Sequence, residues 1–136
     1  SSGIYAAICH IDLARIGFND ITQTYAISPD QRALRAKVLL ESVLFTFLEP
    51  NGAMRTTQAP HLVNFEGVVS YSTAAMPAPT VSPLKDVFRT QVADLAGVLN
   101  RVEDGAVGVA EFDDLTGFGN ILTDLMGWMP YAHQYV

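Results

Sequence analysis

The chain has little cysteine, little charge and no long apolar run. It has 136 residues, of which 16% are charged, and one cysteine, Cys9. A single cysteine cannot form an internal disulfide, which is typical of a reducing cytoplasm, and its apolar neighbours predict a buried, structural thiol. No stretch approaches the ~20 apolar residues of a transmembrane helix. We therefore expect a cytoplasmic protein that has no membrane partner.

The first residues also lack the basic and apolar regions of a signal peptide. There is no initiator methionine, which suggests a trimmed or incomplete chain. At 136 residues we expect a single domain, 1–136, that is a fragment of a longer subunit.

Metal-binding and catalytic motifs are missing from the sequence. His10, His61, His133 and Cys9 do not follow metal-ligand spacings, and no serine lies in a GxSxG motif. The acidic residues between Glu103 and Asp114 are more typical of solvated turns and helix caps than of a cation site. We therefore expect no catalytic residue, no metal and no cofactor.

The distribution of charge is more informative than its total. The net charge is −6, which argues against a nucleic-acid partner. Residues 1–90 nevertheless contain seven basic and seven acidic residues, whereas residues 91–136 contain one basic residue, Arg101, and seven acidic ones. Because the whole excess lies in the last third, a local basic surface can coexist with an acidic total.

The first half predicts a strand followed by a helix. Residues 4–13 are β-branched, aromatic and apolar on both alternate faces, which is typical of a central strand. Residues 14–27 predict a loop with a short hairpin around residues 22–27. Ser28 and Pro29 suit the N-cap and first position of a helix over 29–48. Its apolar stripe should face a sheet: Ala33, Ala36, Leu40, Val43, Leu44 and Phe47.

The second half predicts further strands and helices. Residues 61–73 read as a strand, with a bulge at Gly67, and 74–83 as a proline-rich linker. Ser82-Pro83 predicts a second helix start, residues 106–112 a short strand, and Asp113 or Asp114 the cap of a last helix ending before Pro130. The fold class is therefore α+β, with strand 4–13 beside strand 61–73. We divide the chain into residues 1–73, the linker 74–83 and a helical portion 84–136.

One loop carries groups that bind anions. The segment 52–61 joins the first helix to the second predicted strand, and it holds Arg55, Thr56, Thr57 and Gln58 in succession. Guanidinium, hydroxyl and amide groups hydrogen-bond phosphate oxygens. From the chemistry alone, an ordinary polar loop and an anion-binding loop are equally open.

Other residues are weaker candidates for the same role. Met54 and His61 suit packing and a strand start, or contact with nucleic-acid bases. Arg32 and Arg35 share one face of the first helix, and Lys37 points away from Arg32.

Four phrases occur together in the order that a known family has. They are IYAAICHIDLARIG, DQRALRAKVLLESVLFTFL, GAMRTTQAPH and LVNFEGVVSYST, over residues 4–83. This arrangement resembles the later half of the CRISPR-associated backbone family numbered seven, the DevR-like branch of type I Cascade. Members of that family are longer, and residues 84–136 match no phrase of it. The sequence lacks the family's opening strand, first palm helix and glycine-rich insert.

The resemblance implies a partial, modified RRM-like (ferredoxin-like) palm with additional amphipathic helices. Because half of that unit is absent from the chain, we expect an exposed sheet edge or apolar sheet face. It also implies a non-enzymatic subunit that polymerises along CRISPR RNA, grips its backbone and leaves target recognition to base pairing. Its partners would be that RNA, the target nucleic acid, copies of itself and other Cascade subunits.

The RNA-binding residues are then expected to be Arg55, Thr56, Thr57 and Gln58, with Arg32, Arg35, Lys37, Met54 and His61 as further candidates. Two alternatives stay open. One is a metal-dependent, target-RNA-cleaving relative from type III complexes, which the absence of an acid in the loop disfavours. The other is a helical protein-interaction domain.

Overall fold

The computed structural model describes residues 5–48, 65–72 and 78–127. It forms two compact units, each assembled from two stretches of the chain. The first, which we call the sheet unit, comprises Ser1–Ile11 and Glu66–Asp113, and the second, the helical unit, comprises Asp12–Phe65 and Asp114–Val136. The described elements are helices and small antiparallel sheets, so the predicted α+β class is confirmed.

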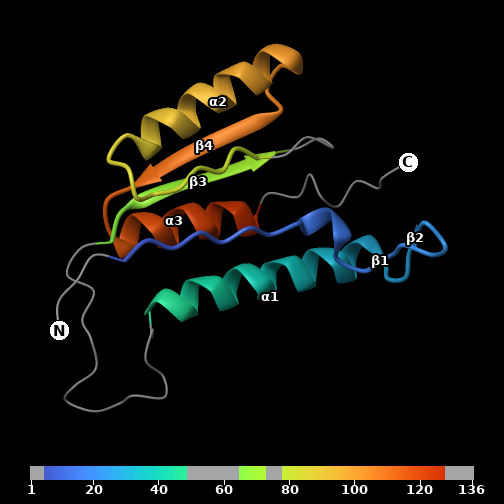
Figure 1. The fold of residues 1–136 in the computed structure, drawn as a ribbon. Helices are drawn as coiled ribbons and strands as arrows, with labels where there is room; N and C mark the ends of the chain where they lie inside the picture. The colour runs from blue at the N-terminus through green and yellow to red at the C-terminus, as the bar shows by residue number, and fades with distance from the viewer. Residues whose placement is uncertain (1–4, 49–64, 73–77, 128–136) are drawn as a thin grey trace, which may run out of the picture. The chain divides into compact units, whose positions relative to one another are not determined.

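The sheet unit is a two-stranded sheet covered by one helix. Strands β3 (Gly67–Ser72) and β4 (Val107–Phe112) are antiparallel, with Gly67 opposite Phe112 at one end and Ser72 opposite Val107 at the other. Helix α2 (Phe88–Val102) lies across one face of this sheet (Figure 1). A small apolar core joins the layers: Ala96, Leu99, Ala106, Val107 and Val109.

Asn100 fixes the turn between α2 and β4. Its Oδ1 accepts from the Val107 backbone N–H at 2.8 Å, and its Nδ2 donates to the Val107 carbonyl at 3.0 Å. Val107 is only 6% exposed, so water has little access to these backbone groups. The Asn100 amide therefore replaces the ladder hydrogen bonds that the start of β4 would otherwise need.

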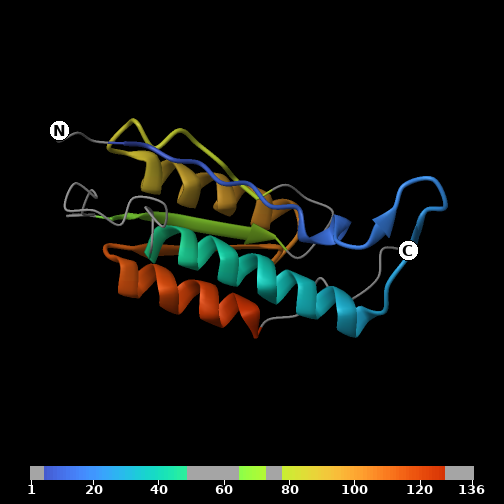
Figure 2. The same cartoon turned by 90° about the horizontal axis from the view of Figure 1, so that it is seen from below.

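The helical unit is built on two long helices. Helix α1 (Pro29–Leu48) and helix α3 (Leu115–Met126) lie side by side and antiparallel (Figure 2). Phe47 near the end of α1 meets Phe118 near the start of α3, with ring centroids 5.5 Å apart. Phe65 completes the cluster, at 5.0 Å from Phe47 and 5.3 Å from Phe118.

Both predicted N-caps at the starts of these helices are confirmed. Ser28 Oγ accepts from the Gln31 N–H at 3.2 Å, and the Asp114 carboxylate accepts from the Gly117 N–H at 2.7 Å. The first helix has the bounds that the sequence predicts. Strand β4 lies within the predicted range 106–112. A hairpin is present in the predicted loop 14–27, but it begins earlier than the predicted range 22–27. It is formed by β1 (Phe18–Asn19) and β2 (Thr24–Tyr25) after the 3-10 turn η1 (Leu13–Arg15).

The prediction of a strand over 4–13 is wrong for the described residues 5–13. They form no strand, and β3 pairs with β4 instead. The side chains from Tyr5 to His10 are exposed, so Cys9 is an exposed thiol and not the buried one that its apolar neighbours suggested. An apolar pattern makes a strand only where a second strand supplies hydrogen bonds to it.

The second helix begins later than predicted. Ser82 Oγ accepts from the Leu84 N–H, two residues on, at 3.4 Å, and α2 starts only at Phe88. This bond closes a turn and does not cap a helix, because Leu84 lies four residues before α2 begins. Gly67 is also no bulge, since it is paired in register with Phe112.

Within its unit, α1 lies against α3. The prediction that its apolar stripe faces a sheet stays a prediction. The RRM-like detail and the domain division stay predictions. None of the helices in the described ranges has the length and apolarity needed to cross a membrane.

Candidate functional site

The start of α1 carries a buried arginine. Arg32 is 1% exposed, the only buried charged side chain among the described residues. Its guanidinium carbon lies 3.7 Å from the centroid of the Tyr25 ring, and its Nε donates to the Ile16 carbonyl at 3.2 Å. Arg32 therefore ties the β1–β2 hairpin and the η1 segment to the first turn of α1.

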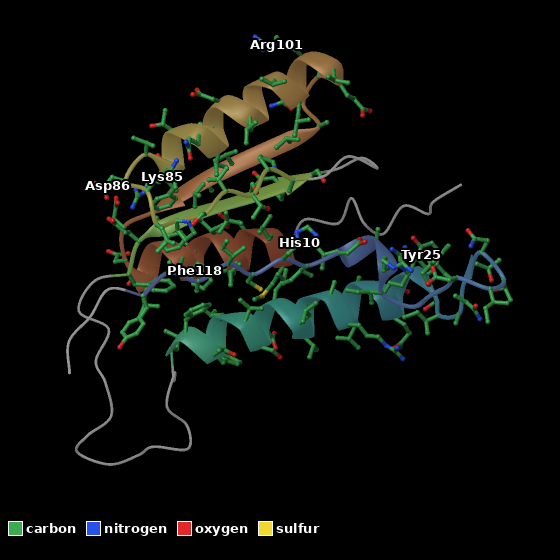
Figure 3. All side chains as sticks on the ribbon, in the orientation of Figure 1. His10, Tyr25, Lys85, Asp86, Arg101 and Phe118 are labelled. Atoms are coloured by element: carbon green, nitrogen blue, oxygen red, sulfur yellow. The ribbon has the colours of Figure 1, made fainter. Side chains whose placement is uncertain are left out.

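The hairpin is shaped to make this contact. Phe18 and Tyr25 are opposite each other in the ladder, with their rings edge to face at 5.0 Å. The Tyr25 hydroxyl donates to the Ala14 carbonyl at 3.0 Å, which fixes the ring beneath the Arg32 guanidinium (Figure 3 labels Tyr25). Gly17 has a φ of +74°, and a side chain there would collide with Ile27, so the backbone approach requires glycine.

No acidic side chain among the described residues forms an ion pair with Arg32. Its Nη1 is buried and has no hydrogen-bond partner among the described residues. The stacked Tyr25 ring supplies a partial compensation, because a cation is attracted to the face of an aromatic ring. Arg32 is thus an internal residue, whereas Arg35 is exposed. The predicted RNA-binding role of Arg32 stays a prediction.

The neighbouring basic residues of α1 are on the surface. Arg35 is exposed, and Lys37 is exposed with its Nζ 3.9 Å from a carboxylate oxygen of Glu41, one turn further on. An exposed pair of this kind contributes little to stability, so Lys37 can leave Glu41 readily for another anion.

In the sheet unit, Arg89 joins the helix to both strands. Its guanidinium donates to Asp113 at 2.9 Å, to Glu66 at 3.2 Å and to the Phe112 carbonyl at 3.0 Å. Glu66 precedes β3 and Asp113 follows β4, so one side chain holds the adjacent ends of the two strands to the first turn of α2. With its donors committed to these partners, Arg89 has a structural role.

The loop of segment 52–61 lies outside the described residues, and with it Met54, Arg55, Thr56, Thr57, Gln58 and His61. Their predicted role in binding RNA therefore stays a prediction, as does that of Arg35 and Lys37. Within the described stretches, no group of three or more His, Cys, Asp or Glu residues is arranged to hold a metal ion.

A family model decides the relationship that the sequence phrases suggest. The model described as "CRISPR-associated negative auto-regulator DevR/Csa2" matches residues 1–92, which is more than half of the chain. The chain belongs to the DevR/Csa2 family. The comparisons with curated proteins and with solved structures gave no match.

The family match covers only part of the structure. The β1–β2 hairpin, α1, the loop of segment 52–61 and β3 lie within it, whereas β4 and α3 lie beyond it. Arg32, Tyr25 and the loop are therefore parts of the DevR/Csa2 portion. Residues 93–136, which hold the whole acidic excess, are outside the match.

Sequence reasoning missed two structural arrangements in this CRISPR-associated chain. The stacking of Arg32 on Tyr25 joins residues seven apart through a hairpin. The contacts of Arg89 with Glu66 and Asp113 span 23 and 24 residues. No local pattern marks a contact of that range.

Proposed function

We propose that this CRISPR-associated protein is a non-enzymatic subunit of a type I effector complex of the Cascade kind, in the family numbered seven, with an RRM-like palm. It binds CRISPR RNA through the sugar–phosphate backbone, works in the cytoplasm, and assembles along the RNA with further copies of itself and with other subunits. The observation that carries the proposal is the DevR/Csa2 match over residues 1–92.

The loop supports the backbone-binding part of this proposal. Arg55, Thr56, Thr57 and Gln58 lie inside the matched range and provide one cation and several neutral donors in a row. Such groups hold phosphates without reading the bases. A subunit that repeats along a guide needs this kind of contact, because the sequence is read by pairing between guide and target.

The described surface supports a narrow role for the remaining basic residues. Arg15 is paired with Asp20, Lys37 with Glu41, and Arg89 with Glu66 and Asp113, while Arg32 is buried. Arg35, Lys85 and Arg101 are exposed and have no ion pair within the described stretches, and Arg101 lies outside the family match. Few free cations accompany Arg55, so the loop carries most of the proposed phosphate binding.

The test is the salt dependence of RNA binding by Arg55→Ala. We expect weaker binding to two unrelated single-stranded RNAs alike, and a slope of log K against log salt that falls by about 0.7 to 1. Lys85→Ala is the matched control: it removes one free cation from outside the loop and should leave the slope unchanged. The isotherms are measured with the full chain in its assembled complex.

Three other outcomes would decide against the proposal. An Arg55→Ala protein with wild-type slope and affinity would make the loop an ordinary structural one. Metal-dependent cleavage of bound target RNA would favour the type III relative. Failure of the wild-type chain to bind RNA at any salt concentration would favour the protein-interaction domain.

A further inference from the structure

Helix α2 has an apolar stripe on the side that the sheet does not use. Its inner face buries Val92 at 2% and Ala96 at 5% exposed. On the outer side Leu95, Val98 and Val102 are 42%, 45% and 75% exposed. Their spacing of three and four residues aligns them along the helix, as at the core positions of a coiled coil. The helix is thus apolar on two faces, and the sheet unit covers one.

Two opposite charges border this stripe on one side. Asp94 directly precedes Leu95 and Arg101 directly precedes Val102, and both are exposed (Figure 3 labels Arg101). They are seven residues apart, about 10 Å along a helix, which is too far for them to pair with each other. Neither has an ion-pair partner within the described stretches of the chain.

We propose that this outer face of α2 is a docking site for a second copy of the chain, with the two helices antiparallel about a two-fold axis. In that arrangement Leu95 packs against the partner subunit's Val98, and Val98 against the partner subunit's Leu95. Residues on the same flank of the stripe meet across an antiparallel pair. Asp94 therefore faces the partner's Arg101, and Arg101 faces the partner's Asp94.

The charges select this occupant and this direction. A two-fold contact requires a surface that is complementary to itself, and one acid and one base placed symmetrically about the centre of the stripe satisfy that condition. A parallel pair would put Asp94 level with the partner's Asp94 and would form neither ion pair. The contact does not involve RNA, so its test is separate from the test of the proposed RNA binding.

The interface is small, so the dimer is expected to be weak. Three apolar side chains and two charges a side fall well below the roughly 20–30 residues a side of a stable interface. The association should therefore depend on protein concentration. Sedimentation velocity of the full chain without RNA, over a range of concentrations and at low salt, measures it directly.

The first variant places a charge in the centre of the stripe. Val98→Asp should abolish the dimer, because each subunit would bury one carboxylate against the partner's leucine. Val38→Asp is the matched control: Val38 is 51% exposed on α1, so the same substitution in a helix there should leave the dimer intact. Circular dichroism of both variants checks that they fold.

The second test exchanges the charges. Asp94→Arg alone, and Arg101→Asp alone, each replace both intersubunit pairs by like charges and should weaken the dimer by about tenfold. The double variant restores opposite charges across the interface and should recover wild-type association. Because both residues are exposed, neither single change is expected to unfold the protein.

The outcomes separate the proposal from a general surface effect. A monomer at every concentration would overturn it, and so would a dimer that Val98→Asp leaves unchanged. A dimer that the single charge variants weaken and the double variant does not restore would refute the antiparallel contact. Recovery in the double variant supports it, since no contact within one helix can produce that rescue.

Discussion

Truncation of Arg32 should destabilise the helical unit more than any other change to a basic residue of α1. Arg32→Ala removes a hydrogen bond from a charged donor to the Ile16 carbonyl, worth about 1.5–3 kcal/mol. It also removes the stack on Tyr25, worth about 0.5–2 kcal/mol. Loss of the unpaired Nη1 from the interior offsets part of this. We expect a net loss of about 2–4 kcal/mol in the free energy of unfolding.

A second substitution separates packing from charge. Arg32→Met keeps much of the buried volume and removes the cation, and an apolar residue often replaces a buried charge with little loss. We expect its destabilisation to stay below about 1.5 kcal/mol. Arg35→Ala is the matched control, an exposed arginine one turn along the same helix, with an expected change within about 0.5 kcal/mol.

Urea denaturation followed by circular dichroism measures these free energies in the whole chain. Hydrogen exchange localises the effect, because the Ala26 N–H donates to the Gly17 carbonyl at 2.7 Å and so reports on the hairpin. Its exchange should accelerate in Arg32→Ala and stay slow in Arg35→Ala. Equal stability of these two variants, with unchanged exchange at Ala26, would refute the view that Arg32 holds the hairpin to α1.

Two further predictions concern the sheet unit. Asn100→Ala should lower the free energy of unfolding by about 2–3 kcal/mol, because it removes the side chain that pairs with both backbone groups of the buried Val107. Asn100→Asp keeps the acceptor, so its free energy of unfolding should lie between those of the wild type and Asn100→Ala. A wild-type urea midpoint for Asn100→Ala would contradict the role of the amide. Gly67→Ala should cost about 1–3 kcal/mol, since its Cβ would lie 2.6 Å from the Phe112 ring, whereas Gly97→Ala meets nothing within 4 Å and should stabilise α2 by about 0.5–1 kcal/mol. If the melting temperatures of both glycine variants shift in the same direction, the contact with the Phe112 ring does not determine the effect of Gly67→Ala.

The helix starts show what the sequence can and cannot predict. Ser28-Pro29 and Ser82-Pro83 carry the same local pattern, yet only the first begins a helix at once. The hydroxyl of Ser28 reaches the third residue on, and that of Ser82 the second. A serine permits both geometries, so the local pattern alone does not fix the residue at which the helix begins.

Strands were harder to predict for a related reason. The strand predicted near residues 107–112 forms because β3 lies beside it and supplies hydrogen bonds. The strand predicted over residues 5–13 does not form, because an apolar pattern does not specify which strand would pair with it. The residues of the candidate site also differ in how far the sequence predicts them. The loop around Arg55 was recognised from adjacent residues in the sequence, whereas the burial of Arg32 depends on a hairpin whose contacts no periodicity encodes.

The balance of charge bears on how the proposed subunit would hold RNA. Arg35 and Lys85 are the exposed and unpaired basic residues that the structure describes within residues 1–90, and Arg55 adds a third. Even if all three touched phosphates, a single copy on single-stranded RNA would lose only about fourfold in affinity when the salt concentration doubles. Its binding would be correspondingly weak. Copies that contact one another along the same RNA multiply such contacts, since each further copy binds at a high effective concentration. Under the proposed function, affinity for the guide is therefore a property of the assembly, and an acidic net charge on each subunit is no obstacle to it.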